Sequence, residues 1–201
     1  MNPEPDFRQW IGRRETAEDT IGAAAVAGMS ATMDRDDPPP ESGTPLPALW
    51  HWMLFAPRVR ASGLGADGHP ARGGFMPPVD LPRRMFAGAR LRFHAPLRVG
   101  DAVRQEAEIT DVTAKSGRSG SLLFVTVDYR YLGPRGLALE EVQDIVYRDH
   151  PSPGAPSGAG GRPEGAFAWR RTVTPDPILL FRYSALTFNG HRIHYDRAYA
   201  I

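Results

Sequence analysis

The feature that most constrains the fold is an alternation of apolar and polar residues that starts near Ala89 and continues to Tyr147. Leu91 and Phe93 alternate with polar residues, which is typical of a strand with one buried face. A turn is predicted over 96–101. The alternation then continues, and segments with the composition of turns interrupt it, so three more strands are predicted, over 103–113, 121–132 and 137–147. Strands joined by such short turns pair antiparallel, so a doubly wound parallel sheet is excluded.

A helix is predicted ahead of these strands, from about Ala17 to Met33. Thr16 can cap its N-terminus, and Asp19 lies three residues later, next to the positive end of the helix dipole. One face of this helix is apolar, with Ile21, Ala25, Met29 and Met33. One helix followed by a meander predicts an α+β fold, in which an antiparallel sheet wraps on the helix.

Charge and cysteine content exclude several classes of function. The chain has 24 basic and 23 acidic residues, a net charge of +1, so we expect no nucleic-acid partner. It has no cysteine, which excludes disulfides, thiolate metal sites and a cysteine nucleophile, and predicts a cytoplasmic protein. The longest apolar stretch, over 21–29, is about half of what spans a bilayer, so we expect no membrane segment.

Composition divides the chain into two predicted units. Residues 151–165 consist almost entirely of Pro, Ser, Gly and Ala, which is typical of a linker. We therefore predict one domain over 1–150 and a second unit over 166–201. In the second unit, 167–173 is predicted as a strand, and 177–186 as a helix with proline in its first turn and Thr174 or Asp176 as its cap.

The densest group of polar side chains in the sequence follows that helix. It comprises Asn189, His191, Arg192, His194 and Asp196, around Gly190. Imidazole titrates near neutral pH and can move a proton, the asparagine amide can hold a water molecule but cannot act as a base, and arginine can bind an anion. Proton transfer with a positioned water is the reaction class that these residue types favour.

Two other interpretations of this group stay open from the residues alone. His191, His194 and Asp196 could bind a metal, but the spacing H-x-x-H-x-D matches no strong ligand signature, so we expect no metal. The group could also be a solvated loop whose histidines pair with nearby carboxylates.

Residues 181–199 closely resemble the hydratase motif of the MaoC-like and hydroxyacyl-thioester dehydratase type 2 group of hot dog fold proteins. The family motif has an Asp, an Asn two residues later and a His five residues after the Asp, and Asn189, His191 and His194 keep this spacing. Asn189 stands at the position of the Asp. This substitution is similar to the two-domain branch, which includes mesaconyl-CoA and itaconyl-CoA hydratases.

The resemblance also covers the N-terminal part of the chain. Segments 10–13, 73–88 and 97–101 are similar to the non-catalytic N-terminal hot dog domain of the same branch. The resemblance implies that 1–150 is this domain and that 166–201 is the start of the catalytic hot dog domain. A hot dog domain needs on the order of 100 residues, so we expect either a truncated member of the family or a second domain completed by another chain.

The activity implied by the resemblance is reversible addition of water across the α,β double bond of an acyl-CoA thioester, with no cofactor besides the CoA of the substrate. His194 would be the general base in hydration and the acid in dehydration, and Asn189 would orient the water. His191 and Arg192 would contact the substrate. Arg83 and Arg84 would bind CoA phosphates or a dicarboxylic acyl group, or else be solvated loop residues.

Two further functions remain as alternatives. One is a hot dog thioesterase, which would require a carboxylate at the position of Asn189. The other is a non-catalytic thioester-binding or assembly subunit, which is consistent with the short C-terminal unit. A homodimer or larger homo-oligomer is expected from the resemblance. Trp50, Trp52 and Phe55 could line an acyl tunnel, although such a bulky cluster is more often core.

Overall fold

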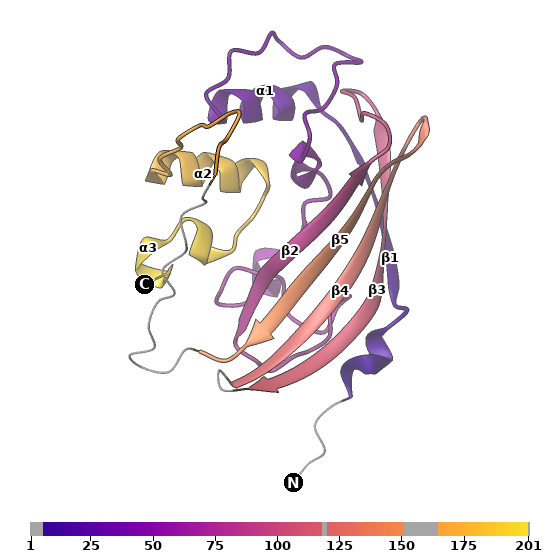
Figure 1. Cartoon of the computed structure of the whole chain (residues 1–201), viewed down its shortest axis with the longest axis vertical. Coiled ribbons are helices and arrows are strands. Elements are labelled where there is room, and N and C mark those ends of the chain that lie inside the picture. Colours follow the sequence, from indigo (N-terminus) through magenta and orange to yellow (C-terminus); the bar gives the residue numbers. More distant parts are fainter. Residues whose placement is uncertain (1–5, 118–119, 151–164, 201) are drawn as a thin grey trace.

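A computed structural model describes residues 6–117, 120–150 and 165–200. Its centre is one antiparallel sheet in the order β1-β3-β4-β5-β2, with α1 across one end of the sheet, α2 beside α1, and α3 farther from α1 (Figure 1). The strands are β1 (Arg14–Thr20), β2 (Arg83–Phe93), β3 (Ala102–Gly117), β4 (Gly120–Gly133) and β5 (Gly136–Arg148). The helices are α1 (Ala23–Thr32), α2 (Pro177–Leu186) and α3 (Arg197–Ala200), and the 3-10 turns are η1 (Phe7–Trp10), η2 (Trp50–Met53), η3 (Ala61–Gly63) and η4 (Arg192–His194).

The predicted meander is confirmed in β3, β4 and β5, and the strand containing Leu91 and Phe93 is β2. Each strand is longer than the alternation indicated. Gly120 and Gly136, at the two hairpin turns, have φ of +94° and +93°, a left-handed conformation that glycine adopts without a steric penalty. The turn glycines of the sequence therefore set the hairpins of the sheet.

The predicted start of the first helix is wrong. The helix begins at Ala23, and Thr16 and Asp19 lie instead in β1, opposite Glu106 and Val103 of β3. β1 is an edge strand that is mostly exposed, so no alternation of apolar residues marks it in the sequence. The backbone of this segment pairs with β3. This pairing, rather than the capping pattern, determines that the segment is a strand and not the start of a helix.

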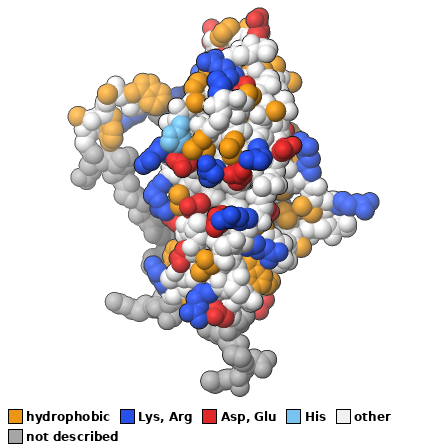
Figure 2. All heavy atoms as spheres, turned by 90° about the vertical axis from the view of Figure 1, so that its right-hand side faces the viewer, with side chains coloured by type: hydrophobic (Ala, Val, Ile, Leu, Met, Phe, Trp, Pro, Cys, Tyr) orange, Lys and Arg blue, Asp and Glu red, His pale blue; other side chains and the backbone are white. Residues whose placement is uncertain are grey.

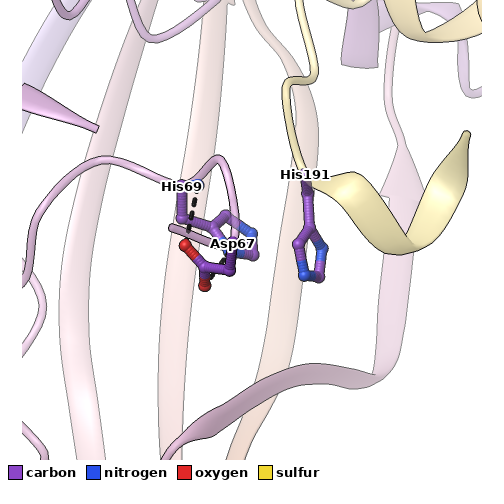
Figure 3. A group of neighbouring side chains, drawn as sticks. All are labelled: Asp67, His69 and His191. Atoms are coloured by element: carbon purple, nitrogen blue, oxygen red, sulfur yellow. Dashed lines mark hydrogen bonds and ion pairs between the residues drawn. The ribbon is translucent and has the colours of Figure 1, made fainter. Parts of the chain in front are cut away.

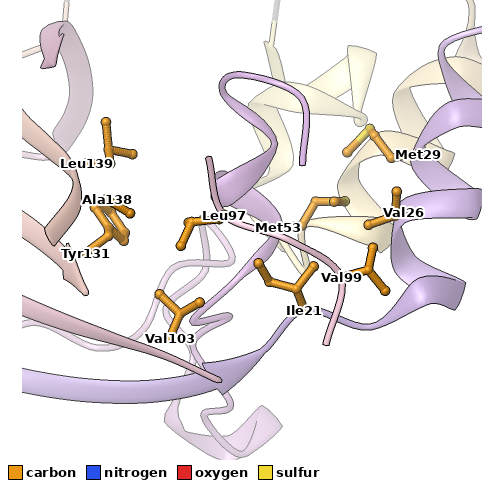
Figure 4. Packing of buried hydrophobic residues seen from close by; sticks show 10 residues of the cluster. All are labelled: Ile21, Val26, Met29, Met53, Leu97, Val99, Val103, Tyr131, Ala138 and Leu139. Carbon is orange, nitrogen blue, oxygen red and sulfur yellow. The ribbon is translucent and has the colours of Figure 1, made fainter. Parts of the chain in front are cut away.

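The core lies on one face of the sheet, in two clusters. At one end, Ile21, Val26 and Met29 around α1 pack against residues of the strand ends (Figure 4), and Trp50 and Phe55 pack against this cluster as core residues. At the other end, Val79 packs with buried residues of the central strands: Ala107, Ile109, Val112, Leu123, Val125, Val127 and Tyr147. The irregular segment before β2 therefore covers the part of the sheet that α1 does not reach.

Charged side chains of both signs are interspersed on the side of the molecule nearest β1 and β3 (Figure 2). Three ion pairs join neighbouring strands of the sheet: Arg14 with Glu108, Arg90 with Asp144, and Arg130 with Glu106. Mixed charges of this kind produce no extended field of one sign. No helix in the part of the chain that the structure describes is long and apolar enough to cross a membrane.

The C-terminal segment packs onto α1 through α2. Asp176 caps α2 by accepting a hydrogen bond from the backbone N–H of Leu179 at 2.8 Å, which confirms one of the two predicted caps. A methyl group added at Gly28 of α1 would lie 3.0 Å from Leu186, so the two helices touch closely. The outer side of α2 is open, and Ile178 and Phe181 are 69% and 67% exposed.

Two other predictions for the C-terminal part have different outcomes. The predicted strand over 167–173 is wrong, because these residues form an irregular exposed segment and pair with none of the described strands. The predicted linker over 151–165 lies outside the described residues except for Gly165. The division into two domains stays a prediction.

Glu141 of β5 is a buried carboxylate with four hydrogen-bonding partners. Its side chain is 0% exposed, and it accepts hydrogen bonds from Tyr131 at 3.0 Å and Gln143 at 2.8 Å. Trp52 and His51 of η2 also bond to it, each at 3.0 Å. Burial by itself would raise the pKa of Glu141, but the bonds from His51 and Gln143 outweigh burial and lower it. This anion anchors η2 on the sheet.

We expect Glu141→Gln to lower the free energy of unfolding by about 3–5 kcal/mol, since an amide cannot accept from all four partners. Urea unfolding followed by tryptophan fluorescence measures this change.

The stabilisation by Glu141 depends on pH. The pKa of Glu141 in the folded state is below the unfolded value of about 4.3, so its contribution to the free energy of unfolding is fully present above that pH and is lost as the pH falls through the lower folded value. Wild-type protein should thus lose more stability on acidification than the variant. Glu140→Gln, at the neighbouring more exposed position, is the control, and equal effects would contradict the assignment.

Candidate active site

The hydratase-like motif is a loop between α2 and α3 that begins with a sharp turn. Phe188 has φ of +49°, and the N–H of Asn189 donates to the carbonyl of Ser184 at 2.8 Å, which closes the end of α2. The side-chain oxygen of Asn189 then accepts from the backbone N–H of His191 at 3.0 Å. Asn189 therefore shapes the turn that presents His191.

A second loop, over 65–69, meets the motif backbone to backbone. Gly68 has φ of +85°, and a Cβ on it would lie only 1.9 Å from the carbonyl oxygen of Gly190. The N–H of Arg192 donates to the carbonyl of Asp67 at 2.9 Å. A side chain at Gly68 would force the two loops apart. Their contact brings Asp67 and His69 to the motif.

Three imidazoles and one carboxylate gather at this contact, and Figure 3 shows Asp67, His69 and His191. Nδ1 of His69 is 3.0 Å from Oδ2 of Asp67. The rings of His69 and His191 lie 3.8 Å apart between centroids at an angle of 37°, and the ring of His194 meets that of His191 edge-on at 5.1 Å. His191 is 8% exposed, and His194 is more exposed but still partly covered.

Burial makes these imidazoles hard to protonate. It lowers the pKa of His191 to about 4, with further lowering from the nearby His69 and His194. Burial also lowers the pKa of His69 and of His194, and the guanidinium of Arg84 lowers that of His69 further. For Asp67, burial would raise the pKa, but the hydrogen bonds from His69 outweigh it and lower the pKa. At neutral pH the site thus holds uncharged imidazoles, which can accept protons, beside a carboxylate.

The predicted substrate-binding arginines lie in different surroundings. The guanidinium of Arg192 bonds to Asp196 through Nε at 3.1 Å and Nη2 at 2.8 Å, so it stabilises the motif loop. Arg83 and Arg84 are the first two residues of β2 rather than loop residues, and successive strand residues point to opposite faces. Arg84 pairs with the buried Tyr147 on the core face of the sheet, and its charge acts on His69 and His191.

Sequence reasoning missed Asp67 and His69. They lie in the stretch that was predicted only to be irregular, and the signal that could have marked them is the order Asp67-Gly68-His69, in which Asp67 accepts from the backbone N–H of His69 at 3.0 Å. Asn189, His191 and His194 do come together as the motif predicted. Their catalytic and binding roles stay predictions.

The same group contains a possible set of metal ligands that differs from the one weighed in the sequence. Asp67, His69 and His191 each offer a ligand atom, and these atoms lie within 4.8 Å of one another. However, the rings of His69 and His191 lie against each other, 3.8 Å apart between centroids at an angle of 37°, whereas imidazoles on one cation aim their nitrogens at it. Asp196 is engaged by Arg192. We therefore interpret the group as acid–base residues.

Comparison with known proteins identifies the family of this chain. The family model described as hydroxyacyl-thioester dehydratase type 2 matches residues 49–201, which includes both loops of the site. The chain belongs to this family. It is 54% identical to the mesaconyl-C(4)-CoA hydratase of Chloroflexus aurantiacus over 97% of the chain and 70% of that protein. It is 27% identical to the mitochondrial hydroxyacyl-thioester dehydratase type 2 of Schizosaccharomyces pombe over 78% of the chain and 59% of that protein.

Solved structures support the fold. HtdX from Mycobacterium tuberculosis superposes with a TM-score of 0.57 at 20% identity, over 92% of this chain and 67% of HtdX. A MaoC-like dehydratase superposes with a TM-score of 0.59 at 13% identity, over 97% of this chain and 70% of the other. The predicted α+β hot dog fold is thereby confirmed, as is the predicted family.

The contact between the two loops can be tested with Gly68→Ala. The added methyl group requires an unfavourable φ and overlaps Gly190, so we expect the loops to separate and the pKa of His191 to rise from about 4 toward its ordinary value of about 6.5. NMR titration of the histidine ring signals measures this shift. Gly74→Ala, where a Cβ would meet nothing within 4 Å, is the control. An unchanged His191 titration in Gly68→Ala would contradict the contact.

Proposed function

We propose that this chain acts in the reversible hydration of an enoyl-CoA thioester. The observation that carries the proposal is the pair of uncharged imidazoles, His191 and His194, at the matching positions of the motif in a chain 54% identical to a mesaconyl-C(4)-CoA hydratase. The chain covers 59–70% of the length of its curated relatives, so the activity of the whole protein is part of the proposal. It needs no cofactor besides the CoA that the substrate carries.

In this mechanism His194 is the general base. Its uncharged ring takes a proton from water while the water oxygen bonds to Cβ of the substrate, and the electrons of the double bond move toward the thioester carbonyl. A proton is then delivered to Cα, which completes the addition of water. In dehydration His194 returns the proton to the leaving hydroxyl. Asn189, whose side-chain oxygen bonds to His191, keeps its NH₂ group to orient the water.

The substrate class proposed is a dicarboxylic acyl-CoA of the mesaconyl type, which keeps one free carboxylate. Arg84 is its proposed partner, since it lies on the core face of β2 and its charge reaches the imidazoles of the site. A guanidinium matches a carboxylate through two parallel hydrogen bonds. Assembly as a homodimer or larger homo-oligomer and a cytoplasmic location belong to the same proposal.

The test of the reaction is hydration of mesaconyl-C(4)-CoA by the chain, followed by loss of enoyl-thioester absorbance. We expect His194→Ala to lower kcat by about 10²–10⁴-fold, the usual contribution of a general base. His94→Ala, which removes a histidine paired with Glu140 on the surface, should leave kcat unchanged. Release of free thiol would instead favour a thioesterase, and binding of the thioester without turnover would favour the assembly subunit.

Arg84 is tested by comparing two substrates. Arg84→Gln should lower kcat/KM for mesaconyl-C(4)-CoA by about 10–100-fold, the value of a hydrogen bond to a charged group. It should change kcat/KM for crotonyl-CoA, which has no free carboxylate, much less. Arg90→Gln, which loses only a surface ion pair with Asp144, is the control. An equal loss for both substrates would exclude recognition of the carboxylate by Arg84.

A further inference from the structure

The mechanism above leaves one pair of the site unused. His69 lies 122 positions before His191 in sequence, yet the two rings lie only 3.8 Å apart between centroids. The pair is partly shielded, with 26% of the Asp67 side chain and 20% of the His69 side chain exposed. A half-buried carboxylate bonded to one nitrogen of an imidazole is the usual means of orienting a catalytic histidine.

Hydration requires a second proton transfer, which this pair can perform. The reaction places a hydroxyl on Cβ and a proton on Cα, so protons move at two different carbons of the substrate. Position 189 carries an amide, which cannot accept or release a proton at neutral pH, and its oxygen is already bonded to the backbone of His191. The motif therefore provides His194 for the water, while its carboxylate, Asp196, is already bonded to Arg192.

We propose that His69, oriented by Asp67, is the group that transfers the proton at Cα. This inference rests on the proposed hydratase function. In dehydration, Nε2 of His69 takes the Cα proton, the C–H electron pair forms the double bond, and the Cβ–O bond breaks as the hydroxyl leaves with a proton from His194. In hydration, protonated His69 gives its proton to Cα, and His194 takes one from water. The two imidazoles then exchange protons with solvent to begin the next cycle.

The geometry fixes which nitrogen of His69 is free. Because Asp67 is held as a carboxylate, it accepts the proton of Nδ1, so the lone pair of the uncharged ring is on Nε2. Two backbone hydrogen bonds close the loop that carries the pair: the N–H of Gly65 donates to the carbonyl of His69 at 2.8 Å, and the N–H of Gly68 donates to that of Gly65 at 2.9 Å. These bonds and the bond to Asp67 orient the ring of His69.

Charged and titratable groups from each neighbouring element act on His69. Asp67 of its own loop raises the pKa, while Arg84 of β2 and His194 of the motif lower it. His191 lies against the ring and is uncharged at neutral pH. Because the lowering effects, with burial the largest, outweigh the bond to Asp67, the pKa of His69 is below its ordinary value. The ring is thus an acceptor at neutral pH, which suits removal of the Cα proton.

The experiment compares His69→Gln and Asp67→Asn with wild type and with the surface control His94→Gln, whose histidine also pairs with a carboxylate, at 2.7 Å. A 3-hydroxyacyl-CoA is incubated in D₂O, and dehydration and deuterium incorporation at Cα are followed together. We expect His69→Gln to lower the rates of dehydration and of deuterium incorporation at least 100-fold, with KM changed less than threefold. Asp67→Asn should lower both rates at least 10-fold. His94→Gln should match wild type.

Two further measurements separate a proton-transfer role from a structural one. Added imidazole should restore part of the kcat of His69→Ala, since the small base can occupy the vacated space. The pH profile of kcat should shift upward in Arg84→Gln, because removing that positive charge raises the pKa of His69. Circular dichroism and the affinity for CoA check that the variants are folded.

The outcomes distinguish the two proposals. A folded wild-type chain that performs no hydration or dehydration overturns the proposed function and this inference with it. Wild-type turnover together with a His69→Gln variant that keeps a third or more of kcat overturns the role of His69 alone. A raised KM with unchanged kcat, or a failure of imidazole to rescue His69→Ala, also overturns proton transfer by His69 and leaves the hydratase function standing.

Discussion

The candidate site depends on the close approach of two glycine backbones. Gly68 and Gly190 come from loops far apart in the sequence, and the carbonyl oxygen of Gly190 occupies the space that a side chain on Gly68 would need. Only residues without Cβ allow a contact of this kind. It permits the backbone bond from Arg192 to Asp67 and brings the rings of His69 and His191 to 3.8 Å between centroids. The acid–base group is thus a product of backbone packing.

The sheet holds this contact in place from both ends of the segment that carries Gly68. At one end, η2 is anchored by the buried carboxylate of Glu141, which accepts from His51 and Trp52. At the other end, Val79 is buried among the central strands, four residues before the start of β2. The irregular loop between them has few hydrogen-bonded elements of its own, so its position follows from these two attachments. A polar bond in the core therefore supports a site at the surface.

Electrostatics then determine what the site can do. Burial disfavours the charged form of each imidazole, and their proximity to one another and to Arg84 adds to this effect. Asp67 remains ionised because His69 donates to it both from the ring and from the backbone. The result is a set of proton acceptors beside one negative charge, which is a suitable environment for reactions in which water is added or removed. Arg192, which was predicted to contact the substrate, bonds to Asp196 within the motif.

The sequence by itself determined the local features. Period-two alternation and turn glycines specified β3, β4 and β5, Asp176 and Pro177 specified the start of α2, and the motif spacing identified His191 and His194. β1 was missed because an exposed edge strand has no buried face to create a pattern. The strand expected over 167–173 does not form, because apolar residues make a strand only where a partner strand offers backbone groups. Only the tertiary structure shows that Asp67 and His69 belong to the site. They reach it through a contact with the motif loop, which is far away in the sequence, whereas sequence patterns report only residues that are neighbours along the chain.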